Sequence, residues 1–135
     1  MPDDCIFCKI VLGGIPAYKV GESDRAVAFL DIHPIHPGHT LVIPRAHVED
    51  VLDLSKDEYD AVMGLAQEVG NTIRSAFNPP RVGYLVKGFD IPHAHVHVFP
   101  MYEDADMKPF KYPHGLPPKA DDDGLALIAK KMKPA

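Results

Sequence analysis

The sequence contains no tryptophan and only two cysteines among its 135 residues. Those two, Cys5 and Cys8, stand three positions apart and cannot cross-link a domain of this size, which excludes a disulfide-stabilised secreted scaffold. The chain also lacks the run of about 20 apolar residues that a membrane-spanning helix needs. Its first four residues, MPDD, lack the basic and apolar stretches of a secretion signal. We therefore expect a cytoplasmic protein with no membrane partner.

An excess of positive charge is missing as well. The chain has 14 basic and 19 acidic residues, and the formal net charge is −5. The basic residues are scattered, which argues against a protein that coats duplex nucleic acid, although a single phosphate ligand is compatible with them. Hydrophobic residues make up 46% of the chain and charged residues 24%, a globular balance. The length is that of one ordinary domain, so we expect a single domain over residues 1–135.

Two helices are predicted by their end signals. Ser55 and Glu58 form a capping-box pattern ahead of an apolar stripe of 3.6-residue period, which predicts a long helix ending near Phe77. A short helix is expected over 5–11, with Asp3 and Asp4 as possible caps and a glycine end at residues 13–14. Residues 124–133 are compatible with a short terminal helix. The many prolines between 100 and 119 predict an irregular C-terminal tail from about residue 101.

Five apolar or alternating runs predict strands, with turns or loops rich in glycine and proline between them. The runs cover residues 17–20, 25–30, 40–43, 82–87 and 93–99. A mostly antiparallel sheet of about five strands with the long helix against it is therefore expected, which is an α+β fold.

The last of these runs, HAHVHVF at residues 93–99, alternates strictly. Successive side chains of a strand point to opposite faces, so the three imidazoles are expected on one face and the small apolar residues on the other. We expect the apolar face to be the core side, because the opposite register would bury three histidines. A chance match to this pattern has a frequency of about 0.03 in a chain with this histidine content.

Two chemistries use imidazoles in a row on a rigid strand. In the first, one neutral histidine attacks an electrophile while its neighbours orient it and stabilise charge. In the second, the histidines chelate a divalent metal that keeps an open water position. Spacing alone does not separate the two.

This segment resembles the pattern His-φ-His-φ-His-φ-φ, with φ apolar, that gives the histidine triad (HIT) superfamily its name. The resemblance extends to CIFCKI at 5–10, AFLDI at 28–32 and PGHTLVIPRAH at 37–47, which are similar to segments of the Hint-type branch. Together they cover about residues 4 to 100. The resemblance implies a HIT-like fold, a homodimer, and an enzyme that hydrolyses or transfers nucleoside monophosphate from phosphoramidates, dinucleoside polyphosphates or related nucleotide esters.

The resemblance also implies roles for four histidines. His95 matches the nucleophile, which forms a nucleotidyl-histidine intermediate that water then resolves. His97 matches the residue that contacts phosphate oxygens. His93 and His39 match the residues that keep the ring and the proton of the nucleophile in order. A neutral imidazole suits this step, because it is a competent nucleophile near pH 7.

The same matching implies a substrate-binding set and exposes one departure from it. Phe29, Asp31 and Ile32 match residues that hold base and ribose of a purine nucleotide, although Phe29 and Ile32 are equally compatible with simple core.

The Asn-x-Gly…Gly-Gln loop usual in the branch is absent before the triad, and Asp90 stands where the family has a hydroxyl. An ionised Asp90 would repel phosphate, so it is protonated, points away, or faces a different leaving group. Lys87 is a candidate phosphate contact or a solvated lysine.

Cys5, Cys8, His47 and His93 form a possible zinc set. Two thiols and two imidazoles have the chemistry of a closed structural zinc site, and several HIT-like proteins look similar at these positions. Zinc would then be structural, and no cofactor is required for the chemical step. The alternative is that the cysteines are buried small apolar groups.

Two other functions stay open at this point. One is a metal-dependent hydrolase that uses the histidine triad as ligands. The other is a nucleotide-binding regulatory module with little turnover, which the altered loop at 87–92 motivates. His33, His36 and His114 match no role in the family and are expected to be solvated loop histidines.

Overall fold

The computed structural model describes residues 4–110 and 117–133. Its elements in chain order are α1 (Ile6–Val11), β1 (Lys19–Glu22), β2 (Ala26–Leu30), β3 (Thr40–Pro44), η1 (Val51–Asp53), α2 (Lys56–Phe77), β4 (Arg81–Leu85), β5 (Val96–Met101), η2 (Asp104–Phe110) and α3 (Asp122–Lys131). The five strands form one antiparallel sheet in the order β1-β2-β3-β5-β4. The expected α+β fold with a five-stranded antiparallel sheet is confirmed.

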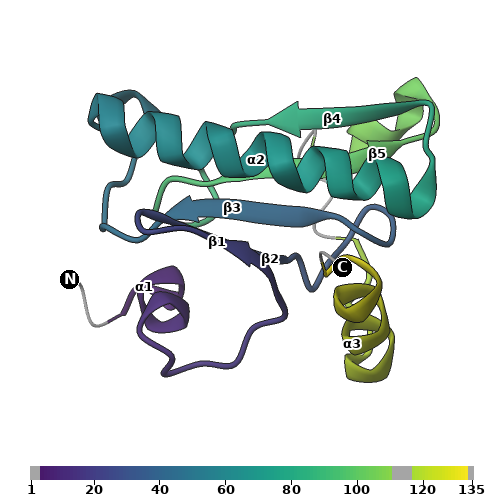
Figure 1. Cartoon of the computed structure of the whole chain (residues 1–135), viewed down its shortest axis with the longest axis horizontal. Coiled ribbons are helices and arrows are strands. Elements are labelled where there is room, and N and C mark those ends of the chain that lie inside the picture. The colour runs from purple at the N-terminus through teal and green to yellow at the C-terminus, as the bar shows by residue number, and fades with distance from the viewer. Residues whose placement is uncertain (1–3, 111–116, 134–135) are drawn as a thin grey trace.

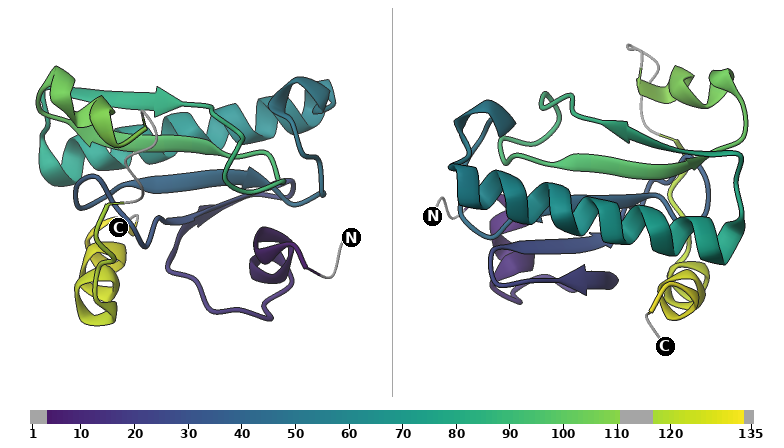
Figure 2. Two further views of the ribbon diagram at one scale, coloured as in Figure 1. Left: turned by 180° about the vertical axis from the view of Figure 1, so that it is seen from behind. Right: turned by 45° about the horizontal axis from the view of Figure 1, so that its top comes forward.

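The sheet carries a helix on each face. The long helix α2 runs across one face, and α1 lies on the side away from it (Figure 1). Alternate residues of the central strands divide the core accordingly. Val42 and Val98 pack in the cluster that includes α2, whereas Leu41 and Ile43 pack with the residues of α1. A view from behind and a view tilted by 45° both place α1 and α3 at opposite ends of the molecule (Figure 2).

The ends of α2 follow from its local sequence. The Ser55 hydroxyl accepts the Glu58 backbone N–H, and the Glu58 carboxylate accepts the Ser55 N–H, so the predicted capping box is formed. At the other end Asn78 adopts a left-handed conformation and its N–H reaches the Arg74 carbonyl. Two prolines follow, which cannot continue the helix.

The start of α1 differs from the expected one. Its N-cap is Cys5, whose Sγ accepts the Cys8 backbone N–H at 3.4 Å. Asp4 lies in an exposed turn and does not cap the helix, and Asp3 lies outside the described residues. The cap position therefore brings the sulfurs of both cysteines to the first turn of the helix.

The strand that carries the histidine pattern begins later than predicted. Strand β5 starts at Val96, so His93 and His95 precede it. The cause lies in Pro44, which has no N–H for a ladder bond and whose carbonyl accepts the His93 ring Nε2–H at 2.9 Å. Pairing of β5 with β3 consequently ends at the Val96–Val42 pair.

The C-terminal segment is more regular than expected. Strand β5 runs to Met101, and η2 follows where an irregular tail was predicted. The Asp106 carboxylate organises this turn by accepting the backbone N–H groups of Tyr102 and Glu103. The predicted terminal helix is present as α3, which packs Leu125 and Met132 into the same core as α2. Within the described ranges, no helix has the length and apolar character needed to cross a membrane.

Candidate active site

Four of the histidines singled out from the sequence lie together in the interior. His39, His93, His95 and His97 are buried, each with at most 6% of its surface exposed. The apolar residues Val96 and Val98 face the core beside α2, as expected. The histidine face is buried as well, so only its expected exposure is wrong. The face opposite α2 is covered by Phe7 of α1, whose ring lies edge-on to His93 and His95 at 5.8 and 5.4 Å between centroids.

The tautomer of His95 follows from one hydrogen bond. Its Nδ1 lies 2.8 Å from the backbone carbonyl of His93, and a carbonyl only accepts. The proton of a neutral His95 ring therefore resides on Nδ1, and Nε2 carries the lone pair. This is the tautomer in which an imidazole presents a nucleophilic nitrogen at the far end of its ring.

A second chain of hydrogen bonds fixes His39 and His97. The backbone N–H of Ile35 donates to Nδ1 of His39 at 3.0 Å, so the His39 proton resides on Nε2. That Nε2 lies 2.9 Å from Nδ1 of His97 and donates to it, which leaves the His97 proton on Nε2. Burial lowers the pKa of both rings to about 3, so both are neutral near pH 7.

The backbone before His39 depends on a glycine. Gly38 has φ +103°, a region that residues with a Cβ rarely adopt. A Cβ at this position would also lie 2.8 Å from the Phe77 ring at the end of α2. The tight passage lets the chain enter β3 immediately after His39, and the Thr40 hydroxyl closes it by donating to the Gly38 carbonyl.

Asp31 lies beside the paired rings. Its Oδ2 is 3.5 Å from Nε2 of His39 and 3.9 Å from Nδ1 of His97, and its Oδ1 accepts the His33 backbone N–H. Burial is the main cause of a pKa raised above the ordinary value for an aspartate. The carboxylate is 17% exposed and therefore accessible to a hydroxyl-bearing ligand.

The apolar residues expected at a base site separate into two environments. Phe29 is 4% exposed and packs edge-on against Phe7 at 5.4 Å between centroids, while Ile32 is 43% exposed at the mouth of the loop. The sequence reasoning missed Phe7, which touches two of the triad rings. Its place in a short amphipathic helix predicts burial, but nothing local predicts contact with residues almost ninety positions away.

Lys87 and Asp90 occupy the loop before the triad. Lys87 Nζ lies 3.3 Å from the Asp90 carboxylate, and a carboxylate oxygen of Asp90 lies within 4.8 Å of ring nitrogens of His95 and His97. Asp90 therefore faces the triad, which rules out the interpretation that it points away. Its negative charge is offset by the lysine beside it.

The four residues of the predicted zinc set converge. Nδ1 of His93 lies 3.4 and 3.5 Å from the sulfurs of Cys5 and Cys8, and Nδ1 of His47 lies 3.2 Å from the sulfur of Cys8. A tetrahedral zinc ion with ordinary bond lengths separates a sulfur from a nitrogen by about 3.6 Å, so the donor set fits the ion. The His93 Nε2–H is held by the Pro44 carbonyl, which turns the Nδ1 lone pair toward the thiols.

Two histidines expected to be solvated have partners. His33 Nδ1 lies 2.9 Å from the Pro117 carbonyl, and His36 Nε2 lies 2.9 Å from the Asp106 carboxylate. Both rings are only partly exposed, so the expectation for them is wrong. The loop is held at both points by the segments that follow β5. His114, the third residue of that expectation, lies outside the described residues.

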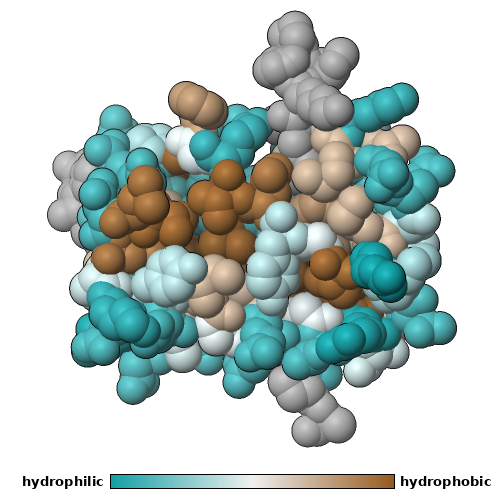
Figure 3. All heavy atoms as spheres, turned by 90° about the horizontal axis from the view of Figure 1, so that it is seen from above, coloured by the Kyte–Doolittle hydropathy of each residue, from teal (hydrophilic) through white to brown (hydrophobic). Residues whose placement is uncertain are grey.

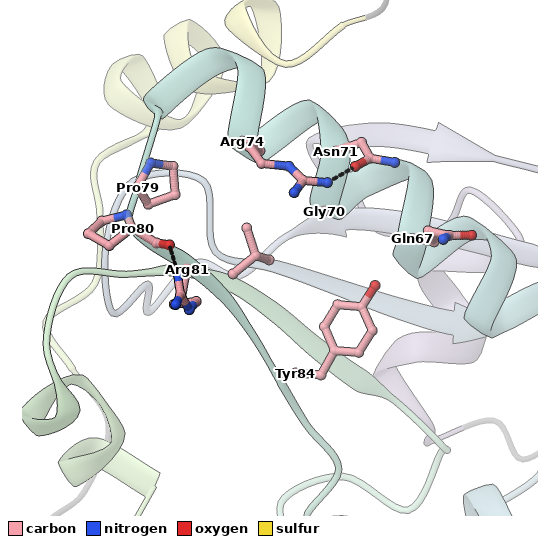
Figure 4. A pocket seen from close by; sticks show the side chains of 9 residues that line it. Gln67, Gly70, Asn71, Arg74, Pro79, Pro80, Arg81 and Tyr84 are labelled. Carbon is pink, nitrogen blue, oxygen red and sulfur yellow. Dashed lines mark hydrogen bonds between the residues drawn. The ribbon is translucent and has the colours of Figure 1, made fainter.

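A separate hollow of about 490 Å³ lies between α2 and β4, with Arg74, Arg81 and Tyr84 around it (Figure 4). Among the described residues, its lining includes no histidine, cysteine or carboxylate. Arg74 points along the helix toward Asn71 rather than across the hollow. The titratable groups that could carry chemistry therefore gather on the other side of the sheet.

Comparison with known proteins agrees with this arrangement. The chain is 39% identical over 104 residues to an uncharacterized HIT-like protein of Mycoplasma genitalium, covering 73% of this chain and 74% of that protein. It is 36% identical over 97 residues to the adenosine 5'-monophosphoramidase of Schizosaccharomyces pombe, covering 71% and 73%. The crystal structure of a Hit-like protein involved in cell-cycle regulation from Bartonella henselae superposes with a TM-score of 0.83 at 27% identity, covering 98% and 97%. The sequence model of the protein family described as HIT domain matches residues 13–104 of this chain. The chain therefore belongs to the HIT family.

Proposed function

We propose that this protein is a nucleotide hydrolase or nucleotidyl transferase that acts through a covalent nucleotidyl-histidine intermediate at His95. The observation that carries the proposal is the 2.8 Å contact from Nδ1 of His95 to the His93 carbonyl, which leaves the lone pair on Nε2. The proposed substrates are nucleoside phosphoramidates, dinucleoside polyphosphates or related nucleotide esters. The monophosphoramidase name of the fission yeast relative favours the first of these.

In the first step, Nε2 of His95 attacks the α-phosphorus and a new P–N bond forms. The bond from phosphorus to the leaving nitrogen or oxygen breaks, and its electron pair stays with the leaving atom, which takes a proton from solvent. In the second step, water attacks phosphorus, the P–N bond to His95 breaks, and the pair returns to Nε2. Nucleoside monophosphate is released, and the proton of the water passes to solvent.

The groups around His95 can stabilise the negative charge on the phosphate oxygens of a bound nucleotide. The Nε2–H of His97 is a donor for phosphate oxygens, and the hydrogen bond from His39 keeps it so. Asp31 is an acceptor for ribose hydroxyls. Because His39 and His97 are neutral, the site attracts phosphate through oriented N–H groups and through Lys87 rather than through imidazolium charge.

The test is turnover of adenosine and guanosine phosphoramidates and of dinucleoside polyphosphates by the wild type and by His95→Ala. Intact-mass analysis after rapid quenching monitors the protein for one added nucleoside monophosphate. We expect turnover and a mass increase in the wild type and neither in the variant. His33→Ala, which removes another half-buried histidine, is the matched control and should keep both.

The alternatives give different outcomes. Turnover that survives His95→Ala would reject the covalent mechanism, and sensitivity to chelators at the same time would favour a hydrolase that uses the triad as metal ligands. Tight binding of nucleoside monophosphate without turnover of any substrate would favour a regulatory binding module.

We also propose that Cys5, Cys8, His47 and His93 hold a structural zinc ion. The ion would tie α1 to the segment that carries the nucleophile, because His93 offers its ring to the metal and its carbonyl to His95. Metal analysis of protein purified without chelators should give one zinc per chain, and Cys8→Ser should abolish it. Full metal content in Cys8→Ser would contradict this assignment.

A homodimer is the proposed assembly. Strand β4 is an edge strand, and Tyr84, Val86 and Phe89 in and after it are exposed. Seen from above, hydrophobic atoms gather in a band across this side of the molecule (Figure 3). Light scattering should give twice the chain mass of 14.9 kDa. Tyr84→Arg, in β4, should give the mass of the monomer. The control Leu127→Arg, at an exposed position of α3, should keep the mass of the dimer. A wild type with the mass of one chain would reject the dimer.

The packing of α3 into the core beside α2 supports one domain over the whole chain, which we retain as a proposal. Cys5 and Cys8 form a closely spaced thiol pair suited to metal binding, which favours a reducing compartment, and the cytoplasm is the location we propose.

A further inference from the structure

A polar bridge joins two segments that frame the buried histidines. Nε2 of His36, in the loop before β3, lies 2.9 Å from Oδ1 of Asp106, in the turn after β5. We call this contact the His36–Asp106 bridge. The loop carries His39 and β5 carries His97, so the bridge ties together the two segments that must bring these rings into contact.

The Asp106 end of the bridge is fixed by its own surroundings. Asp106 is 8% exposed, and its second oxygen accepts the backbone N–H groups of Tyr102 and Glu103 at 2.7 and 3.1 Å. These bonds and the contact with His36 hold the pKa of the carboxyl below its ordinary value despite burial. The His36 ring also lies edge-on to Tyr102 at 4.9 Å between centroids. The Asp106 carboxylate is therefore fixed in position by its own contacts, and the contact with His36 holds the loop before β3 against it.

The loop end of the bridge leads directly to His39. The His36 carbonyl accepts the His39 backbone N–H at 3.1 Å, and the N–H of Ile35, one residue earlier, donates to Nδ1 of His39 at 3.0 Å. That second bond selects the tautomer of His39. A shift of the backbone at residues 35 and 36 would remove it, and the proton of His39 would no longer be confined to Nε2.

We propose that the His36–Asp106 bridge is a positioning device that holds the Ile35 amide against His39 and so fixes the donor direction from His39 to His97. Neither His36 nor Asp106 is placed on the substrate. The consequence for turnover rests on the proposed function, whereas the consequence for the His39 tautomer does not. This separation determines the design of the test.

The first arm of the test measures tautomers by two-bond ¹⁵N–¹H correlation of histidine-labelled protein, with His39 assigned through the spectrum of His39→Gln. The wild type should show His39 protonated at Nε2 with an unprotonated Nδ1. In His36→Ala and in Asp106→Asn we expect averaged His39 nitrogen shifts, because both tautomers become populated. His36→Gln keeps a polar N–H group at this position and should restore the wild-type pattern.

The second arm measures kinetics with whichever substrate the wild type turns over. A relay that is misplaced by a fraction of an ångström should lower kcat by about ten- to a hundredfold with KM within about threefold. His33→Ala is the matched control, because it removes the other loop bridge, to Pro117, and leaves the His36 contacts in place. It should keep both the His39 tautomer and kcat.

The outcomes separate the two proposals. An unchanged His39 tautomer in both His36→Ala and Asp106→Asn would overturn the positioning role, even if their melting temperatures fell. If one of them does not fold, the other decides. Averaged His39 shifts in a protein that turns over no substrate would uphold the bridge and reject the proposed enzyme. A tautomer change with unaltered kcat would overturn the link between the bridge and catalysis.

Discussion

Nε2 of His39 lies 2.9 Å from Nδ1 of His97, and both rings are buried. Each ring has a pKa of about 3 because burial disfavours the imidazolium form. The pair therefore works as a neutral relay with one direction, from the Ile35 amide through His39 to His97. This neutrality makes the fold sensitive to acid.

Stability should fall as the pH is lowered from about 6.5 toward 3. In the unfolded chain both histidines take up protons below pH 6.5, whereas in the folded chain they stay neutral, so acid favours unfolding. Each ring contributes a slope of about 1.4 kcal/mol per pH unit in this window. Asp31, whose burial raises its pKa, acts in the opposite direction at the acid end.

Urea unfolding at intervals between pH 7.5 and 4 measures this slope. His39→Gln removes one of the two titrating rings. The free energy of unfolding should then fall less steeply with pH, and its value near pH 7 should be lower than in the wild type. A free energy of unfolding that stays constant down to pH 4.5 would show that the rings are already charged in the folded state.

Phe7→Ala should destabilise the protein by about 3 to 5 kcal/mol, the usual cost of deleting a buried phenyl ring. The ring is 6% exposed and contacts His93, His95 and Phe29, so its loss opens a cavity directly beside the nucleophile. We expect kcat to fall as well, because His95 gains room to turn. Ile6→Ala, on the exposed side of the same helix, should cost less than about 1 kcal/mol. Equal effects of the two variants would contradict the packing described for α1.

Gly38→Ala should cost about 2 kcal/mol or more and reduce turnover. The residue has φ +103°, and an added Cβ would approach the Phe77 ring to 2.8 Å. Gly64→Ala in α2 is the opposite control, because nothing lies within 4 Å of its Cβ position and alanine is the better helix former. Thermal denaturation of both variants compares them, and a neutral Gly38→Ala would mean that the loop before His39 tolerates another path.

Lys87→Ala should raise KM for an anionic nucleotide severalfold. The substitution leaves the Asp90 carboxylate without the ammonium 3.3 Å away, and the unbalanced negative charge then faces the phosphate. Adding Asp90→Asn to Lys87→Ala removes that charge and should recover much of the loss. If Asp90→Asn alone lowers kcat strongly while KM is unchanged, Asp90 acts as the acid for the leaving group and not as half of an ion pair.

The features that could be predicted from the sequence are those encoded over short distances or implied by matched family positions. The capping box of Ser55 and Glu58, the strands, and the meeting of Cys5, Cys8, His47 and His93 all follow from local pattern or from matched family positions. Fold class follows from the number and order of these elements.

The errors arise where long-range packing decides. Alternation alone predicts a strand from His93, but Pro44 on the neighbouring strand gives no N–H and its carbonyl binds the His93 ring. Polar histidines predict an exposed face, but α1 covers it. His36 is predicted to be solvated, because the sequence near it gives no sign of its partner Asp106, 70 positions further along the chain. The contact forms only when β3 and β5 are paired.

The position of β5 between β3 and β4 has a consequence for how the chain folds during synthesis. The N-terminal residues through β4 leave the ribosome before β5, so until then the inner edge of β3 has no neighbour and the apolar side of α2 is incompletely covered. Insertion of β5 is a non-local and therefore slow step. It also brings His97 to His39, 58 residues earlier in the chain. The same late step therefore covers the open edge of β3, which is prone to aggregation, and assembles the histidine relay.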